Sequence, residues 1–412
     1  MVADTAPRGL PRSFWLYLGS RFSAATASTL LRSAVAWHVF ALTQSAFHLG
    51  LVGLVQFVPA LTLTLVGGAV ADTYDRRRVM QIAQLPAFMA ATALAVVTAR
   101  GAVTPLAVYA AVLTLAVATA FDSPARAAFL PSLVPRDRFP RAVTFASTAQ
   151  ALAFATGPGV GGLVIAAVGV AGAYATAAGL VVVAFVLLGL VRVRERAAAR
   201  GTMSLRAVRE GLAFVRRTPV VLGCMTLDMF AVIFGGASAL LPIFADDILG
   251  VGPRGYGLLS SSLELGALAS ALVMTVRSPI ERTGRALVAA VAAYGLATIV
   301  FGLSRWFALS VAAYALAGMA DQVSVVARHT AIQLSAPDDL RGRVSAVNMI
   351  CIAASNQLGA VESGFVAALT SAPFAVVSGG VGCLVVLATV ALLLPELVAY
   401  RAATLAGTRP SA

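Results

Sequence analysis

The sequence predicts an all-α membrane protein with twelve transmembrane helices in two pseudo-symmetric six-helix bundles. Three observations predict this fold class. Of 412 residues, 59% are hydrophobic and only 11% are charged, which is more apolar than an ordinary soluble domain. Twelve apolar stretches reach about the length of ~20 residues that a helix needs to cross a bilayer. One long polar interruption, 192–218, separates the first six stretches from the last six.

The predicted spans are taken from these stretches in chain order. The segment 1–12 is too short for a separate signal peptide, so we expect the first span to act as an uncleaved anchor. The first bundle is predicted to use 14–40, 49–71, 79–99, 105–128, 142–168 and 172–191, and the second 220–245, 255–276, 286–304, 306–334, 344–369 and 374–394.

The polar interruption predicts the domain organisation. We expect an N-terminal bundle over 1–191, a cytoplasmic linker over 192–218 and a C-terminal bundle over 219–412. Within the linker, Leu205, Val208, Leu212 and Val215 recur at helical spacing between arginines. This pattern favours an amphipathic helix along the inner membrane face, with a plain basic tether as the alternative.

An internal repeat supports two related halves. The segments 126–143 and 328–345 read RAAFLPSLVPRDRFPRAV and RHTAIQLSAPDDLRGRVS. Each starts with an arginine, and proline, aspartate and a second arginine follow at equal spacing. Repeated halves of the same topology predict a pseudo-twofold axis along the membrane normal.

The charge distribution predicts orientation rather than nucleic-acid binding. The net charge is +13, and all 30 basic residues are arginine. They gather in the connections after the second, fourth, sixth, eighth and tenth spans, which is the positive-inside pattern. We therefore expect a multi-pass protein of the bacterial inner membrane with both termini in the cytoplasm, and no nucleic-acid partner.

Enzyme chemistry and cofactors are not predicted. The three cysteines, Cys224, Cys351 and Cys383, lie inside predicted spans, where a thiol acts as a small hydrophobe. The sequence contains no HExxH or GxSxG motif and no lysine for a phosphate-binding loop. We expect no metal, no disulfide, no cofactor and no enzymatic activity.

A short hinge after the second span carries a family resemblance. Its glycines, Gly67 and Gly68, would allow close helix packing. Its residues match the loop motif Gly-x-Leu-x-Asp-Arg-x-Gly-Arg-Arg at Gly68, Val70, Asp72, Arg76 and Arg77, while Thr73 and Asp75 depart from it. On these residues the chain resembles the major facilitator superfamily, and within it the bacterial exporter branch of enterobactin-type siderophore and macrolide efflux proteins.

A second match lies in the fifth span, at Gly157, Pro158, Gly161 and Gly162. It is similar to a Gly-Pro-x-x-Gly-Gly motif of antiport-type exporters. Proline inside a helix removes a hydrogen bond and bends the helix, and glycine lets a neighbour approach closely. The motif indicates a helix kink that shapes the substrate cavity, or else ordinary glycine packing.

The resemblance implies a cytoplasmic latch at the hinge. The acid at Asp72 would face the amino end of the eleventh span, where the helix dipole stabilises a carboxylate. Asp122 and Arg126 are four residues apart on the fourth span and share a face. The resemblance implies that Arg76 or Arg77 pairs with Asp122, with a weaker echo of the latch at Arg282 and Arg285. Proton carriage by Asp122 is the alternative.

Several polar groups lie deep in predicted spans, where a charge needs a partner or a function. We rank the acids as proton sites in the order Glu264, Asp321, Asp228, Glu362, and structural pairing is the alternative for each. Asp321 lies seven residues before Arg328, two helical turns away on one face, and could instead join a second latch with Arg282 or Arg285. The candidate proton and substrate cavity comprises Arg32, Asp228, Glu264, Asp321, Asn356, Gln357 and Glu362.

Together these features predict a monomeric secondary transporter that exports a small amphipathic molecule, a drug or a siderophore-like compound, in exchange for protons by alternating access. Its partners would be the small-molecule substrate, protons and the lipid bilayer. A proton-coupled nutrient or metabolite importer is the alternative within the class. A membrane sensor or scaffold is the alternative from another class.

Overall fold

A computed structural model describes residues 10–192, 205–276, 280–337 and 340–401. Within these ranges every regular element is a helix, so the all-helical prediction is confirmed. The chain forms two compact units. Unit 1 comprises the described residues of 1–34 and 62–202, and unit 2 those of 35–61 and 203–412. Two helices, α1 (Arg12–Thr43) and α2 (Ala46–Thr73), contribute to both units. The predicted bundle boundaries near 191 and 219 stay a prediction.

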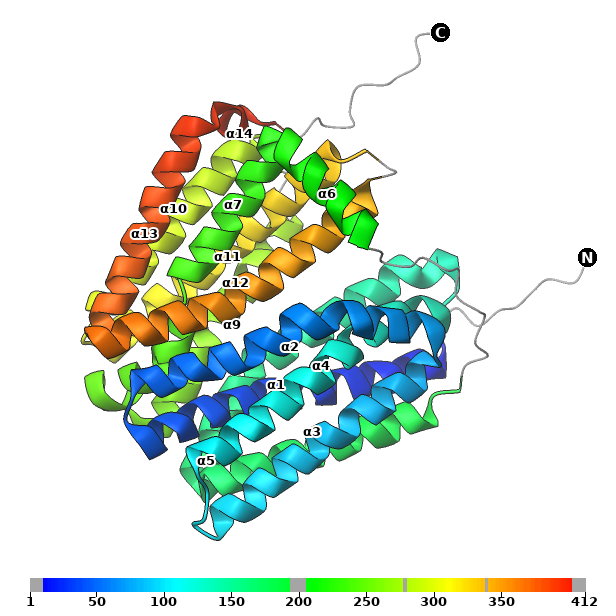
Figure 1. Ribbon diagram of the computed structural model, residues 1–412, viewed down its shortest axis with the longest axis vertical. Coiled ribbons are helices and arrows are strands. Elements are labelled where there is room, and N and C mark those ends of the chain that lie inside the picture. The colour runs from blue at the N-terminus through cyan, green and yellow to red at the C-terminus, as the bar shows by residue number, and fades with distance from the viewer. Residues whose placement is uncertain (1–9, 193–204, 277–279, 338–339, 402–412) are drawn as a thin grey trace, which may run out of the picture. The chain divides into compact units, whose positions relative to one another are not determined.

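Unit 1 is built around α3 (Arg76–Ala99), which packs between α4 (Pro105–Leu133) and α5 (Phe139–Leu190), as Figure 1 shows. A short 3-10 turn, η1 (Arg136–Arg138), joins the last two. Thr104 caps α4 by accepting the Ala107 N–H, and Pro105 follows at the first helical position, where its missing N–H costs nothing. Buried Phe14, Tyr17 and Phe129 form part of the hydrophobic core of unit 1.

The fifth and sixth predicted spans form one element, α5. Its backbone departs from helical geometry at Gly169, with φ +76°. Only glycine reaches this left-handed region without a steric cost. The element therefore contains a break where the sequence predicts a short connection.

Unit 2 contains α6 to α14, the last part of α1 (35–43) and the first part of α2 (46–61). Figure 1 shows α10 next to α11 and α13, and α11 also packs against α9. The long helices are α7 (Pro219–Phe234), α9 (Gly252–Val276), α10 (Thr283–Leu303), α11 (Phe307–Ser335), α12 (Arg341–Leu369) and α13 (Ala372–Leu393); the shorter ones are α6 (Leu205–Arg217) and α14 (Pro395–Ala399).

The seventh predicted span, 220–245, is not one continuous helix. It ends as α7 at Phe234 and continues after Gly235 and Gly236 as η2 (Ala237–Leu240), α8 (Leu241–Ile243) and the π-helical η3 (Phe244–Ile248). Two successive glycines weaken a helix. Gly236 also lies so close to α12 that an added Cβ would be 2.5 Å from the Gly359 carbonyl oxygen. Close packing on α12 accounts for the break.

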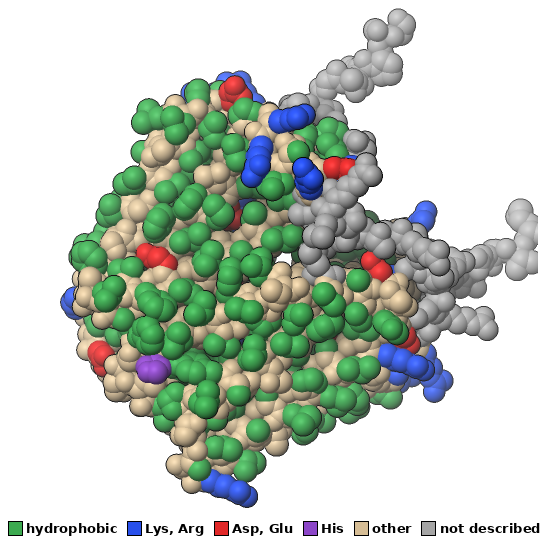
Figure 2. All heavy atoms as spheres, viewed as in Figure 1, with side chains coloured by type: hydrophobic (Ala, Val, Ile, Leu, Met, Phe, Trp, Pro, Cys, Tyr) green, Lys and Arg blue, Asp and Glu red, His purple; other side chains and the backbone are tan. Residues whose placement is uncertain are grey.

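Ten helical segments of the described chain are long and apolar enough to cross a membrane. The segment 136–190 counts once although it holds two predicted spans, and α1, which carries Arg21 and Arg32, is not among the ten. The count of twelve spans stays a prediction. Figure 2 shows hydrophobic side chains over most of the visible face, and many large ones are exposed, such as Leu106 at 76% and Leu369 at 86%. Such a surface suits lipid rather than water.

Candidate functional site

The hinge between α2 and α3 is held by side chains that bind helix ends. Asp75 caps α3 by accepting the Arg78 N–H at 3.0 Å. The Arg76 guanidinium donates to the carbonyls of Ala71 and Ala128, at 3.3 and 3.0 Å. The last carbonyls of a helix lack partners within it, so the guanidinium satisfies that of Ala71, in the last turn of α2, and complements the dipole there. Ala128 lies inside α4, five residues before its end. The hinge thereby joins α2, α3 and α4.

Arg77 performs the same task for α5. Its guanidinium donates to the carbonyls of Gly189 at 2.5 Å and Val191 at 2.8 Å, at the end of that helix. The Asp72 side chain is exposed. Its predicted pairing with the start of the eleventh span stays a prediction.

The two hinge glycines differ in surroundings. A Cβ added at Gly67 would be 2.1 Å from the Ala120 carbonyl oxygen of α4, whereas one added at Gly68 would have no described atom within 4 Å. The close packing expected of both glycines is therefore made by Gly67. Gly68, which matches the family motif, does not need glycine for packing.

Asp122 and Arg126 form a bidentate ion pair on α4. The Arg126 Nη2 lies 2.7 Å from Asp122 Oδ2, and Nε donates to the same oxygen at 2.9 Å. Both side chains are largely buried, 23% and 13% exposed. The expected partnership of Asp122 with Arg76 or Arg77 is wrong, because the acid finds its base one turn away and the hinge arginines bind carbonyls. The Tyr17 hydroxyl ties α1 to this turn by donating to the Arg126 carbonyl.

The glycine-proline motif of α5 is a contact with α1. A Cβ at Gly157 would be 1.9 Å from Thr29 Oγ1, and one at Gly161 would touch Leu30 at 3.5 Å. Gly161 and Gly162 are buried, and α5 remains helical on both sides of Pro158. The structure thus gives the motif a packing role. Its role in shaping a cavity stays a prediction.

Unit 2 holds a cluster of charged side chains on two helices, α7 and α11. Asp228 of α7 forms an ion pair with Arg328 of α11, and these side chains are only 4% and 7% exposed. Asp321, two turns from Arg328 on α11, interacts electrostatically with both partners. Tyr294 of α10 lines the same small cavity, as do Ala231, Val232, Val291 and Ser324. The cavity of about 10 Å³ has roughly the room that one water molecule needs.

The cluster changes two sequence-based expectations. The structure associates Asp321 with Arg328, while the Arg282 and Arg285 side chains are exposed at the start of α10. Sequence reasoning also placed Asp228 among the cavity acids without its base. The repeat already marked Arg328 by its match to Arg126. The residue one turn before Arg328 is Ser324 rather than an acid. This absence of an acid was the signal that the partner of Arg328 lies on another helix.

The other candidates are distributed over several helices. The Arg32 guanidinium of α1 lies over the Phe154 ring of α5, 5.9 Å from its centroid. Glu264 of α9 is partly buried and interacts with Tyr314 of α11. Three candidates lie on α12. The Asn356 side chain donates to the Ile352 carbonyl, and the Glu362 carboxylate accepts the Ser363 hydroxyl. The backbone carbonyl of Gln357 packs closely against Gly53.

The predicted amphipathic helix of the linker is present as α6. It packs on the start of α12, where Glu210 pairs with Arg343 at 2.8 Å and Gly211 meets the Arg343 carbonyl. Val215 is buried, whereas Arg216 and Arg217 are exposed. The helix therefore braces α12.

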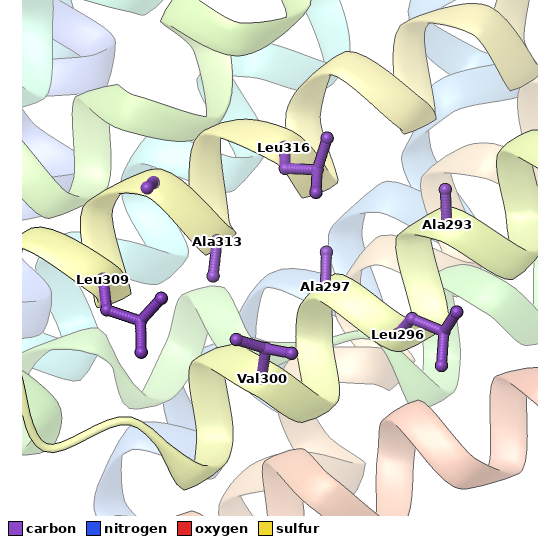
Figure 3. A pocket seen from close by; sticks show the side chains of 8 residues that line it. Ala293, Leu296, Ala297, Val300, Leu309, Ala313 and Leu316 are labelled. Carbon is purple, nitrogen blue, oxygen red and sulfur yellow. The ribbon is translucent and has the colours of Figure 1, made fainter.

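An apolar groove between α10 and α11 is a poor substrate site (Figure 3). Its lining is entirely alanine, leucine and valine, including Ala297, Val300 and Leu309. Binding sites for small molecules combine apolar walls with a few polar groups that orient the ligand. The groove suits a lipid chain or a neighbouring apolar helix surface better.

A family profile described as transmembrane secretion effector matches residues 11–409. The chain belongs to the major facilitator superfamily. It is 25% identical over 383 residues to the enterobactin exporter EntS of Escherichia coli O1:K1 / APEC, covering 93% of this chain and 92% of that protein. The EntS of Shigella boydii serotype 18 has the same identity and coverage.

Solved structures share the fold at low identity. A POT family transporter in complex with 5-aminolevulinic acid aligns with a TM-score of 0.73 at 11% identity, over 95% of this chain and 98% of its own. A bacterial homologue of the human lysosomal transporter Spinster aligns at 0.73 and 13% identity, over 94% and 97%. The chain is therefore a multi-pass membrane transporter for a small molecule, with homology to exporters, of the kind found in the bacterial inner membrane.

Proposed function

We propose that this protein exports a small amphipathic molecule across the bacterial inner membrane in exchange for protons, by alternating access, as a monomer with both termini in the cytoplasm. The observation that carries the proposal is the cluster of two acids, the buried Asp228 and the partly buried Asp321, around the base Arg328. Charges inside a membrane protein are costly and mark ion or proton pathways. The exporter homology supports the direction.

The charge count of the cluster suits proton coupling. One guanidinium balances one carboxylate, so the second carboxylate either keeps a negative charge in an apolar surrounding or takes up a proton. Because Asp228 holds the direct ion pair, Asp321 is the proton carrier in this proposal, and Arg328 can pair with either acid. This arrangement favours Asp321 over Glu264, the first choice from sequence.

Coupling can be measured in proteoliposomes with a pH gradient as the only driving force. We expect Asp321→Asn to abolish uphill transport while exchange of labelled for unlabelled substrate continues, because the neutral side chain keeps its place. Asp246→Asn, at an exposed acid of η3, is the matched control and should retain coupling. Uphill transport by Asp321→Asn at the normal rate would refute Asp321 as the carrier, and the same variant at Glu264 would then be tested.

We propose that the hinge, with Asp72, serves as the cytoplasmic latch of this transport cycle.

The substrate and direction can be measured in cells that lack their own exporters. Accumulation of enterobactin and of a macrolide would be compared with and without the protein, and again after an uncoupler is added. An exporter lowers accumulation only while the proton gradient persists. Raised accumulation would identify an importer, and no change for any compound would favour a sensor or scaffold.

A further inference from the structure

The break in α7 lies beside the acids of unit 2. The helix ends at Phe234, and the chain continues as η2 after Gly235 and Gly236. Val232, in the last turn of α7, lines the small cavity that is also lined by three charged residues. We call these three residues the charge cluster: Asp228, Asp321 and Arg328. The cavity thus brings the charge cluster to the end of the helix.

Tyr294 of α10 connects the charge cluster to the break. Its hydroxyl donates to the Gly235 carbonyl at 3.1 Å. The same residue lines the cavity and interacts electrostatically with Asp228 and Asp321. The approach requires glycine, since a Cβ added at Gly235 would be 2.3 Å from the tyrosine oxygen. Tyr294 therefore contacts the first residue of the break and faces the acids of α7 and α11.

The contacts of the break with α12 and α13 are of another kind. A Cβ added at Gly236 would be 2.5 Å from the Gly359 carbonyl oxygen of α12, and one added at Gly379 of α13 would be 1.9 Å from the Phe234 carbonyl oxygen. Close packing of this kind does not respond to a charge nearby. The hydrogen bond from Tyr294 does respond, because a carboxylate attracts the hydrogen of a hydroxyl.

We propose that the Tyr294 hydroxyl is a positioning group that couples the proton on Asp321 to the break in α7. The inference rests on the proposed function, in which Asp321 carries the proton. A tyrosine hydroxyl has one hydrogen to donate. While Asp321 is protonated, the hydroxyl donates to the Gly235 carbonyl and holds the break.

Loss of the proton gives the hydroxyl a stronger acceptor. A hydrogen bond to a charged group is about twice as strong as one between neutral groups. The ionised Asp321 therefore draws the Tyr294 hydrogen away from Gly235, across a cavity with room for about one water molecule. Without this bond the end of α7 is free to move. Release of the proton is thereby converted into a change of backbone at the break.

Several titratable or charged groups face Tyr294 or the charge cluster. Taken over all the helices packed there, they are Cys224, Asp228, Tyr314, Asp321, Arg328, His329, Cys351 and Cys383. Tyrosine, cysteine and arginine ordinarily titrate above about pH 8. The two acids and His329 are the members of this set that ordinarily titrate below it, so a variant of Asp321 is needed to assign a pH response.

Hydrogen–deuterium exchange of the purified full-length protein in detergent measures the break without transport. Peptides that cover 228–240 are compared at about pH 5 and about pH 8, after correction for the intrinsic pH dependence of exchange. We expect the wild type to be protected about threefold or more strongly at the lower pH, because one hydrogen bond is lost at the higher pH. Tyr294→Phe should lack this extra protection at both values. Asp321→Asn should keep it at both, because a neutral side chain leaves the hydroxyl on Gly235.

Tyr17→Phe is the matched control. In unit 1 the Tyr17 hydroxyl also donates to a backbone carbonyl beside an acid–arginine pair, that of Arg126, but α4 is continuous there. This variant should keep the wild-type pH response of 228–240. Elution as a single peak in size-exclusion chromatography establishes that each variant is folded, and Asp321→Asn alone decides if Tyr294→Phe is not.

Three results would overturn the proposal. They are equal protection of 228–240 at both pH values in the wild type, a pH response that survives in Tyr294→Phe, and one that survives in Asp321→Asn. The last would assign the response to another group of the set, such as His329. The expected response without transport driven by a pH gradient in proteoliposomes would instead refute proton-coupled export and leave the role of Tyr294 intact.

Discussion

The repeat arginines Arg126 of unit 1 and Arg328 of unit 2 occupy matching sequence positions and are paired differently. Arg126 is bound by Asp122, four residues earlier on the same helix. Arg328 is bound by Asp228 on another helix. The first pair is local to α4, whereas the second joins α7 to α11. Only the second must change when these two helices move against each other.

The difference begins with one residue. The position four residues before Arg328 is Ser324, so the arginine has no acid one turn away and is held by an acid of α7. The nearby Asp321 then has no base to itself. A duplicated scaffold can thus keep the same arginine and assign it to two tasks, a rigid turn in one unit and an exchangeable pair in the other.

The largest effect is expected for Arg328→Gln. It leaves Asp228 and Asp321 buried without a base, and removing one partner of a buried pair costs about 3–5 kcal/mol. Thermal unfolding in detergent should show a strongly lowered midpoint. Asp228→Asn should be milder because Arg328 keeps Asp321. The double variant Asp228→Asn/Arg328→Gln should recover much of the loss, and purely additive losses would contradict a direct pair.

Breaking the local pair should cost less. Asp122→Asn leaves Arg126 with a neutral partner and removes charge-assisted hydrogen bonds worth about 1.5–3 kcal/mol. Both side chains are partly exposed, so water compensates for some of the loss. We expect a modest fall in the unfolding midpoint and slower transport whose proton dependence is unchanged. Unchanged transport would refute a latch role, and lost proton dependence would make Asp122 a carrier.

The corresponding helix contacts of the two units can be compared through glycine. Gly67→Ala would press on the Ala120 carbonyl between α2 and α4, and overpacking of this kind costs about 1–3 kcal/mol. Gly318→Ala would press on the Leu263 carbonyl between α11 and α9 in the same way. Gly68→Ala is the control and should be neutral. A harmful Gly68→Ala beside a harmless Gly67→Ala would contradict the packing described for the hinge.

The sequence predicted the helices well and their partners poorly. Apolar runs of span length predicted α3, α4 and α9 to α13 within a few residues, because lipid demands continuous helices. The break after α7 depends on packing against a neighbour, because Gly236 lies against the Gly359 carbonyl of α12. The break at Gly169 of α5, by contrast, lies where the sequence predicts a connection between two spans. The pair of Asp228 with Arg328 joins residues a hundred positions apart. Residue spacing cannot reveal such a contact. The four-residue spacing of Asp122 and Arg126 did place them on one face of a helix, but the family resemblance implied a hinge arginine as the partner of Asp122.

The hinge between α2 and α3 in unit 1 and the connection before α10 in unit 2 should also differ in their need for arginine. Arg77→Gln removes a cation from the carbonyls that end α5, and such an interaction contributes up to about 2 kcal/mol in a partly buried site. Arg285→Gln in unit 2 changes an exposed side chain and should alter stability by less than about 0.5 kcal/mol. The start of α10 in unit 2 is instead held by a backbone hydrogen bond, in which the Gly284 N–H donates to the Tyr400 carbonyl. Equal losses in the two variants would remove this distinction.

The smallest effect concerns the residue that departs from the family motif. Asp75 caps α3, whereas Arg282, at the same place before α10, makes no side-chain cap. Replacing a capping aspartate with alanine costs about 1 kcal/mol, but glycine costs only a few tenths. Asp75→Gly, which restores the glycine of the superfamily motif, should therefore be tolerated better than Asp75→Ala in thermal unfolding. Transport by Asp75→Gly at the wild-type rate would mean that Asp75 serves only the helix. A transport defect in Asp75→Gly without loss of stability would give the carboxylate a part in the latch.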